Sequence, residues 1–99
     1  MKEKDITHIR QALELEFSLL AERYQVQSLG IFGSYVRQEQ RSDSDLDVLV
    51  TFSETPGLLK FIALENYLSD LLGVKVDLVM QDALKPNMRP HILREVIRV

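Results

Sequence analysis

Apolar positions between residues 5 and 24 recur at intervals of three and four, which predicts a helix with one apolar side. The residues on this side are Ile6, Ile9, Leu13, Phe17, Leu20 and Tyr24. Ala12, Leu15 and Leu19 fall nearly opposite, where they form either a second contact surface or scattered apolar residues on an ordinary protein surface. The first predicted element therefore needs a sheet or a second helix to cover its apolar side.

A second element, a strand, is predicted over residues 25–32 from Val26, Leu29, Ile31 and Phe32. Gly30 within it indicates that another segment of the chain lies close by. The strand enters a Gly33-Ser34 turn. Ser34 is a favoured helix N-cap, so a short helix is expected from Ser34 to about residue 39, followed by a polar loop over residues 38–44.

Strict alternation over residues 46–52 predicts a second strand, and residues 74–80 predict a third. Between them, Thr55-Pro56 is a helix start signal, and Gly73 ends an apolar stripe formed by Leu58, Phe61, Leu64, Leu68, Leu71 and Leu72. A strand, a helix and a strand of these lengths form a crossover unit, which places the second and third strands parallel and adjacent. A closing helix is expected over residues 87–96.

These elements predict one α/β (α+β) domain over residues 1–99, with a small mixed sheet of about three strands flanked by helices, in the order α-β-α-β-α-β-α. Hydrophobic residues make up 45% of the chain, which suffices for a core without disulfides, and there are no cysteines. No apolar run approaches a membrane span, so a cytoplasmic protein is expected. The formal charge of −3 argues against stable nucleic-acid binding.

Three aspartates are the first residues that indicate a functional site. Asp45 and Asp47 project from the same side of the second strand, about 6.5 to 7 Å apart, and Asp77 is a charge on the otherwise apolar third strand. Two such charges at about 5 Å repel by roughly 3 kcal/mol at an effective dielectric near 20. A divalent cation removes this cost, and carboxylate oxygens suit Mg²⁺. Asp45, Asp47 and Asp77 are therefore predicted to surround one metal site.

The Gly33-Ser34 turn supplies what a phosphate group needs. Gly33 permits a close backbone approach, Ser34 offers a hydroxyl donor, and Arg37 adds a charged donor one turn later. Acids that hold a metal beside a turn that holds phosphates are typical of phosphoryl or nucleotidyl transfer.

The chain reads Gly33-Ser34, ten residues, then Asp45-Leu46-Asp47, with Asp77 in Val76-Asp77-Leu78-Val79. This pattern resembles the signature of the DNA polymerase beta-like nucleotidyltransferases, in particular the minimal nucleotidyltransferases. The resemblance implies that Asp45 and Asp47 bind Mg²⁺, one ion or two, that Asp77 activates the attacking hydroxyl, and that Gly33, Ser34 and Arg37 contact the triphosphate of ATP.

The resemblance also implies a partner. Minimal nucleotidyltransferases commonly act as antitoxins beside a helical HEPN-type toxin, and some relatives transfer AMP to a tyrosine hydroxyl of it; a homodimer or hetero-oligomer fits this role. Two alternatives stay open. The domain is either a binding module that neutralises its partner by occlusion, or a stand-alone transferase that acts on a small molecule.

The remaining polar residues give weaker signals. His8 and His91 have no second ligand at metal spacing and are interpreted as surface residues. Arg89, Arg94 and Arg98 make the tail basic, which is typical of a solvated face, although such a face also suits an acidic partner or phosphates.

Overall fold

The protein is described by a computed structural model over residues 5–99, in which helices and strands follow one another in nearly the predicted order. The elements are α1 (Ile6–Tyr24), β1 (Val26–Phe32), α2 (Ser34–Arg37), β2 (Leu46–Phe52), α3 (Leu58–Leu72), β3 (Val76–Met80), the 3₁₀ turn η1 (Gln81–Ala83), α4 (Arg89–Glu95) and β4 (Ile97–Arg98). No helix among residues 5–99 has the length and apolar content to cross a bilayer.

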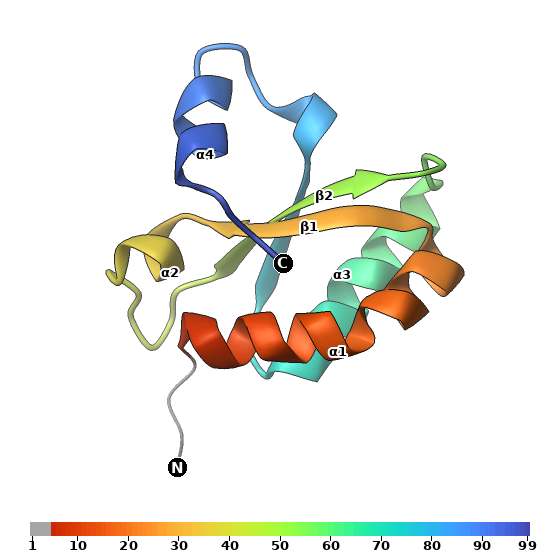
Figure 1. Ribbon diagram of the computed structural model, residues 1–99, viewed down its shortest axis with the longest axis horizontal. Coiled ribbons are helices and arrows are strands. Elements are labelled where there is room, and N and C mark those ends of the chain that lie inside the picture. Colours follow the sequence, from red (N-terminus) through yellow and green to blue (C-terminus); the bar gives the residue numbers. More distant parts are fainter. Residues whose placement is uncertain (1–4) are drawn as a thin grey trace.

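The strands form one mixed sheet in the order β3-β2-β1-β4. β2 and β3 are parallel and adjacent, as the crossover unit predicts, while β1 pairs antiparallel with both β2 and β4. Helices α1 and α3 lie together on one face of the sheet, and η1 and α4 lie on the other (Figure 1). The α+β prediction is confirmed, with four strands in place of about three.

Two buried clusters hold these layers together. Leu46, Val48 and Val50 point from β2 into the larger cluster beneath α1 and α3, whereas Leu49 joins the smaller cluster with Leu84, which follows η1, and Ile92 of α4. The alternation predicted for β2 is thus confirmed, since odd and even positions face opposite layers. Asp47 shares the parity of Leu49 and so belongs to the side of the sheet that carries α4.

The free edge of β3 is covered by side chains of α3. The Val76 N–H donates to Ser69 Oγ at 2.9 Å, and the Leu78 N–H donates to Glu65 Oε2 at 2.9 Å. These bonds satisfy backbone donors that an edge strand otherwise leaves unpaired. They also fix the residues on both sides of Asp77, so its position relative to β2 is well defined.

The end of the chain differs from the prediction. The closing helix stops at Glu95, and residues 97–98 add a strand to β1 instead. A two-residue strand carries too little alternation to be recognised in a sequence. The sequence did predict a close neighbour at Gly30 in β1, with which β4 pairs. This is confirmed, because a Cβ at Gly30 would lie 2.5 Å from Val96 Cγ2.

Two predicted helix starts are wrong. Thr55-Pro56 precedes an extended Gly57 (φ −72°, ψ 171°) that acts as the N-cap, and α3 begins at Leu58. Leu58 is therefore 73% exposed rather than part of the buried stripe. Ser34 is the first residue of α2 rather than its N-cap, because Gly33 takes the cap position with a positive φ, and α2 ends at Arg37 rather than residue 39.

The second apolar surface considered for α1 is largely absent. Ala12 and Leu19 are partly buried against the main core, whereas Leu15 is 85% exposed. Helix α1 thus contacts the core over more than the predicted stripe, and Leu15 remains an apolar residue on the surface.

Candidate active site

Asp47 and Asp77 lie directly opposite each other on neighbouring parallel strands. Asp47 is also the register partner of Phe32 at the end of β1, and Phe32 is followed by Gly33. The strand pairing therefore brings together an acid from β2, an acid from β3 and the glycine-serine turn, although these residues lie far apart in the sequence.

Gly33 lies against the Asp47 carboxylate. Its backbone has φ 85° and ψ −152°, which only glycine adopts readily. A Cβ built at this position would overlap the Asp47 side chain. The glycine is thus required both for the backbone conformation and for the space that the carboxylate occupies.

Asp45 is exposed in the segment before β2. Its negative charge raises the pKa of the Asp47 carboxyl, and it adds to the effect of burial in raising the pKa of the Tyr35 hydroxyl in α2. Asp45 is therefore electrostatically coupled to both β2 and α2. The charges of both Asp45 and Asp77 thus act on the Asp47 carboxyl.

The pKa of Asp47 is raised to about 6, first because the side chain is partly buried and then because of the charges of Asp77 and Asp45. Glu95 adds to the shift, and Arg37 opposes it. The positive charge of Arg37 therefore does not cancel the effect of burial and of the neighbouring acids on the Asp47 pKa. The site is a centre of excess negative charge, which favours binding of a further cation.

The side chains fit a Mg²⁺ ion held by two carboxylates rather than by three. Among residues 5–99, no three acidic, histidine or cysteine side chains stand close enough to ligate one ion together. These side chains as they stand form no such group, so a site that Asp45, Asp47 and Asp77 share around one ion stays a prediction. Mg²⁺ usually takes one or two protein carboxylates and completes its shell with water and substrate phosphates. Asp47, on which the charges of both Asp45 and Asp77 act, would supply that donor chemistry together with a second carboxylate.

Glu95 belongs to the site, and no sequence signal placed it there. Its carboxylate accepts from the Gly33 N–H at 2.7 Å and from Arg37 Nη1 at 2.9 Å. Arg37 also donates through Nε to Glu39 at 3.1 Å. The turn after β1 and the end of α2 are thereby joined to the end of α4.

The raised pKa predicts how Asp47 affects stability. The metal-free folded chain holds the Asp47 proton more tightly than the unfolded chain, so this stabilisation is complete below pH 3.8 and is lost as pH rises through about 6. After allowance for solvent screening, we expect Asp47→Asn to raise the free energy of unfolding by about 1 kcal/mol at pH 7 and by little at pH 4. Urea unfolding with a chelator at both pH values measures this.

Asp43→Asn is the matched control, because it removes an exposed carboxylate from the segment before β2. If Asp47→Asn destabilises the metal-free chain at pH 7 relative to this control, the electrostatic description of Asp47 is wrong.

Comparison with known proteins identifies the family. The nucleotidyltransferase domain family model matches residues 17–99. The chain belongs to this family. The match includes every candidate site residue: Gly33, Ser34, Arg37, Asp45, Asp47, Asp77 and Glu95.

Two relatives of this nucleotidyltransferase align with most of its length. MJ0128 of Methanocaldococcus jannaschii, which bears the provisional name protein adenylyltransferase, is 50% identical over 97 residues, covering 97% of this chain and 99% of that protein. Protein adenylyltransferase MntA of Thermococcus cleftensis is 56% identical over 80 residues, covering 81% of each chain. The chain is accordingly a nucleotidyltransferase, and the family predicted from its motifs is confirmed.

Solved structures confirm the fold. A structure provisionally described as a minimal nucleotidyltransferase has a TM-score of 0.80 and 42% identity, covering 96% of both chains. A toxin-antitoxin complex with AMP-PNP has a TM-score of 0.69 and 23% identity over 86% of this chain and 70% of that one. A tri-AMPylated Shewanella oneidensis HEPN toxin with its MNT antitoxin gives 0.65 and 20%, covering 91% and 70%. The last two show a shared fold.

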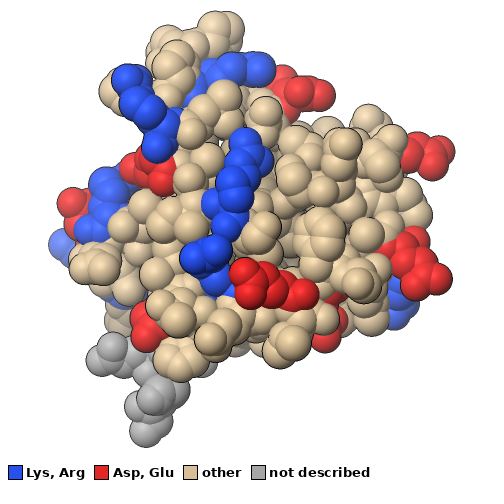
Figure 2. All heavy atoms as spheres, viewed as in Figure 1, with Lys and Arg blue, Asp and Glu red and all other residues tan. Residues whose placement is uncertain are grey.

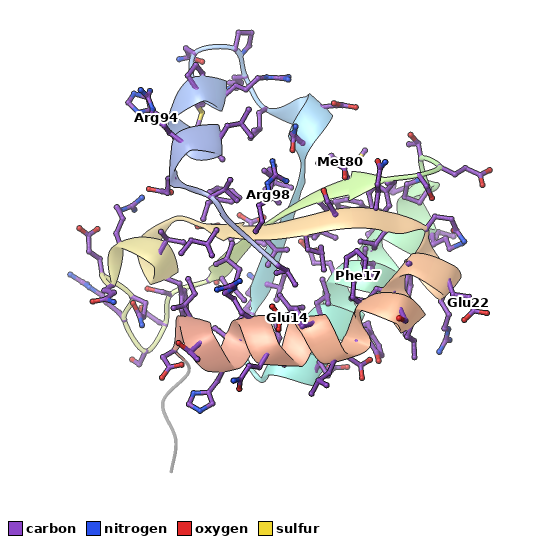
Figure 3. All side chains as sticks on the ribbon, in the orientation of Figure 1. Glu14, Phe17, Glu22, Met80, Arg94 and Arg98 are labelled. Carbon is purple, nitrogen blue, oxygen red and sulfur yellow. The ribbon has the colours of Figure 1, made fainter. Side chains whose placement is uncertain are left out.

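The basic side chains of the tail lie on the surface. Arg94 and Arg98 are exposed, and Arg98 lies over the sheet while Arg94 extends from α4 (Figure 3). Figure 2 shows basic side chains as a column down the middle of this face, which meets acidic side chains at its lower end, near Glu14. His8 and His91 are exposed, as predicted.

Proposed function

We propose that this nucleotidyltransferase uses Mg²⁺ and ATP to transfer AMP to a tyrosine hydroxyl of a helical HEPN-type toxin and thereby acts as its antitoxin. Two relatives that cover most of this chain carry the name protein adenylyltransferase, and one structural neighbour comes from a complex of a tri-AMPylated HEPN toxin with an MNT antitoxin. Another neighbour is a toxin-antitoxin complex with AMP-PNP. These names supply the partner class and the nucleotide for the proposal.

The observation that carries the proposal is the pairing of Asp47 with Asp77 beside the Gly33 turn. Transfer of AMP forms a bond between the acceptor oxygen and the α-phosphorus and breaks the bond to pyrophosphate, while the hydroxyl loses its proton. Asp77 is exposed and adjacent to Asp47, so we assign it the role of proton acceptor.

The remaining residues bind and orient the nucleotide in this proposal. Asp45 and Asp47 would hold Mg²⁺, which when bound neutralises phosphate charge and stabilises the leaving pyrophosphate. The Ser34 hydroxyl and the Gly33 turn would receive the triphosphate, and Arg37 would face its negative charge. Asp45 and Asp77 are both exposed, so a hydroxyl from another protein can approach from solvent.

Incubation with ATP, Mg²⁺ and a HEPN-type protein encoded beside this chain, followed by intact mass spectrometry, tests the proposal. We expect the HEPN-type protein to gain one or more AMP groups, on tyrosine when the site is mapped, and the gain to require both ATP and Mg²⁺. A stable complex without any mass gain would contradict the proposed transfer.

Neutralisation by occlusion is the second candidate, favoured by apolar side chains at the start of α3. Leu58 is 73% exposed and Leu59 is 83% exposed, a surface that a partner protein would bury. The triple variant of Asp45, Asp47 and Asp77 to asparagine separates the two functions. Under the transfer proposal this variant fails to silence the toxin, whereas under occlusion it still does so.

A further inference from the structure

Glu95 connects two groups that the proposed function assigns to the triphosphate. Its Oε2 accepts from the Gly33 N–H at 2.7 Å, and its Oε1 accepts from Arg37 Nη1 at 2.9 Å. The three residues come from the end of α4, the turn after β1 and the end of α2. One carboxylate thus fixes a backbone donor and a side-chain cation at the same time.

The Glu95 carboxylate is better shielded than the other acid on Arg37. The Glu95 side chain is 23% exposed, whereas that of Glu39 is 65% exposed. A charge-assisted hydrogen bond is stronger and more directional where water is partly excluded. Arg37 is therefore oriented mainly by Glu95, and its bond to Glu39 contributes less.

Glu95 is itself firmly placed. The residue that follows it, Val96, packs on Gly30, and Arg98 pairs with Gly30 in the sheet. The chain runs from α4 directly into β4, which lies beside β1 as its antiparallel partner (Figure 1). A carboxylate held between a helix end and a strand has little freedom to leave the Gly33 turn.

The contacts have a direct effect on the phosphate-binding turn. Gly33 has an uncommon backbone conformation, and the bond from its N–H to Glu95 holds that conformation from outside the turn. The charges of Arg37 and Glu95 also act on the Asp47 carboxyl. Glu95 therefore orients an Arg37 guanidinium whose charge acts on Asp47, one of the acids that the proposed function assigns to the metal.

We propose that Glu95 is a positioning residue for nucleotide binding, which holds the Gly33-Ser34 turn and the Arg37 guanidinium in the arrangement that receives the triphosphate. The role rests on the proposed function. In this role the end of α4 and β4 do more than complete the sheet, because together they hold the Glu95 carboxylate at the Gly33 turn.

Binding of an ATP analogue with a methylene group between the α- and β-phosphorus, measured by calorimetry with Mg²⁺, tests the role without turnover. We expect Glu95→Ala to weaken binding by about 10- to 100-fold. Glu95→Gln keeps an oxygen for the Gly33 N–H but loses the charge beside Arg37, so it should weaken binding by about threefold to tenfold. Glu39→Gln is the matched control and should remain within about twofold of wild type.

Steady-state transfer gives a second readout. A positioning role predicts that Glu95→Ala raises KM for ATP more than it lowers kcat, with partial rescue in Glu95→Gln. Unchanged or tighter binding of the analogue by Glu95→Ala would overturn the role, and tighter binding would show that the carboxylate competes with phosphate. If Glu95→Ala does not fold, the affinities of Glu95→Gln and Glu39→Gln for the ATP analogue still test the positioning role. Equal affinities of these two variants would overturn it.

Amide hydrogen exchange at Gly33 distinguishes this proposal from the proposed function. In the nucleotide-free chain, we expect Glu95→Ala to exchange the Gly33 amide at least about tenfold faster than wild type, with no such change in Glu39→Gln. A wild-type chain that binds no nucleotide contradicts the proposed function, whatever the exchange shows. Exchange that is unchanged in Glu95→Ala contradicts the positioning role, whatever the wild type binds.

Discussion

Asp47→Asn is expected to reduce AMP transfer by about a thousandfold or more, because it removes the charge of one of the two acids, Asp45 and Asp47, that would hold Mg²⁺. The change keeps the shape of the side chain, so the contact with Gly33 and the pairing of β2 with β3 should persist. The initial rate of AMP incorporation into the HEPN-type partner measures the effect.

Asp43→Asn again serves as the control, since it removes one exposed carboxylate close to the site in sequence and should leave the rate within about twofold of wild type. The combination of lost transfer with retained or increased stability is specific to a functional acid. Transfer by Asp47→Asn at the wild-type rate would show that Asp47 does not hold the reacting groups.

Gly33→Ala is expected to destabilise the fold by about 3 kcal/mol and to abolish transfer. A side chain at φ 85° and ψ −152° is strained, and its Cβ would overlap the Asp47 carboxylate. The turn and Asp47 must then move apart, which also disturbs the bond from the Gly33 N–H to Glu95. Thermal unfolding and the rate of transfer are the two measurements.

Gly57→Ala is the matched control for this variant. Gly57 has φ −72°, and a Cβ there would meet no heavy atom within 4 Å, so alanine should change the free energy of unfolding by less than about 1 kcal/mol, because the entropic gain opposes the weaker N-cap. If Gly33→Ala is as stable as Gly57→Ala, the close approach of Gly33 to Asp47 does not exist in solution.

Local patterns in the sequence were sufficient to predict the framework. Alternation placed Leu46, Val48 and Val50 on one side of β2, and the length of the intervening helix predicted that β3 lies parallel to β2. Once those two strands are adjacent, Asp47 and Asp77 must come close together. The pair of acids was therefore predictable from the sequence.

The parts that escaped prediction depend on contacts between distant segments. Glu95 reaches Gly33 across 62 residues, and nothing in its neighbours distinguishes it from a surface acid. β4 is too short to show a periodicity, and its position follows from packing on Gly30. Strand spacing fixes the direction of Asp45, Asp47 and Asp77 but not the distance at which three side chains meet, so the metal site stays a prediction.

Titration of the Asp47 side-chain carboxyl by NMR, in the metal-free wild type and in Asp77→Asn, tests most directly whether the two acids share one site. The expected result is a pKa of about 6 in the wild type, which falls when the Asp77 charge is removed. Addition of Mg²⁺ with the ATP analogue should shift both carboxyl signals in the wild type. An Asp47 pKa that is the same in Asp77→Asn would contradict a joint site.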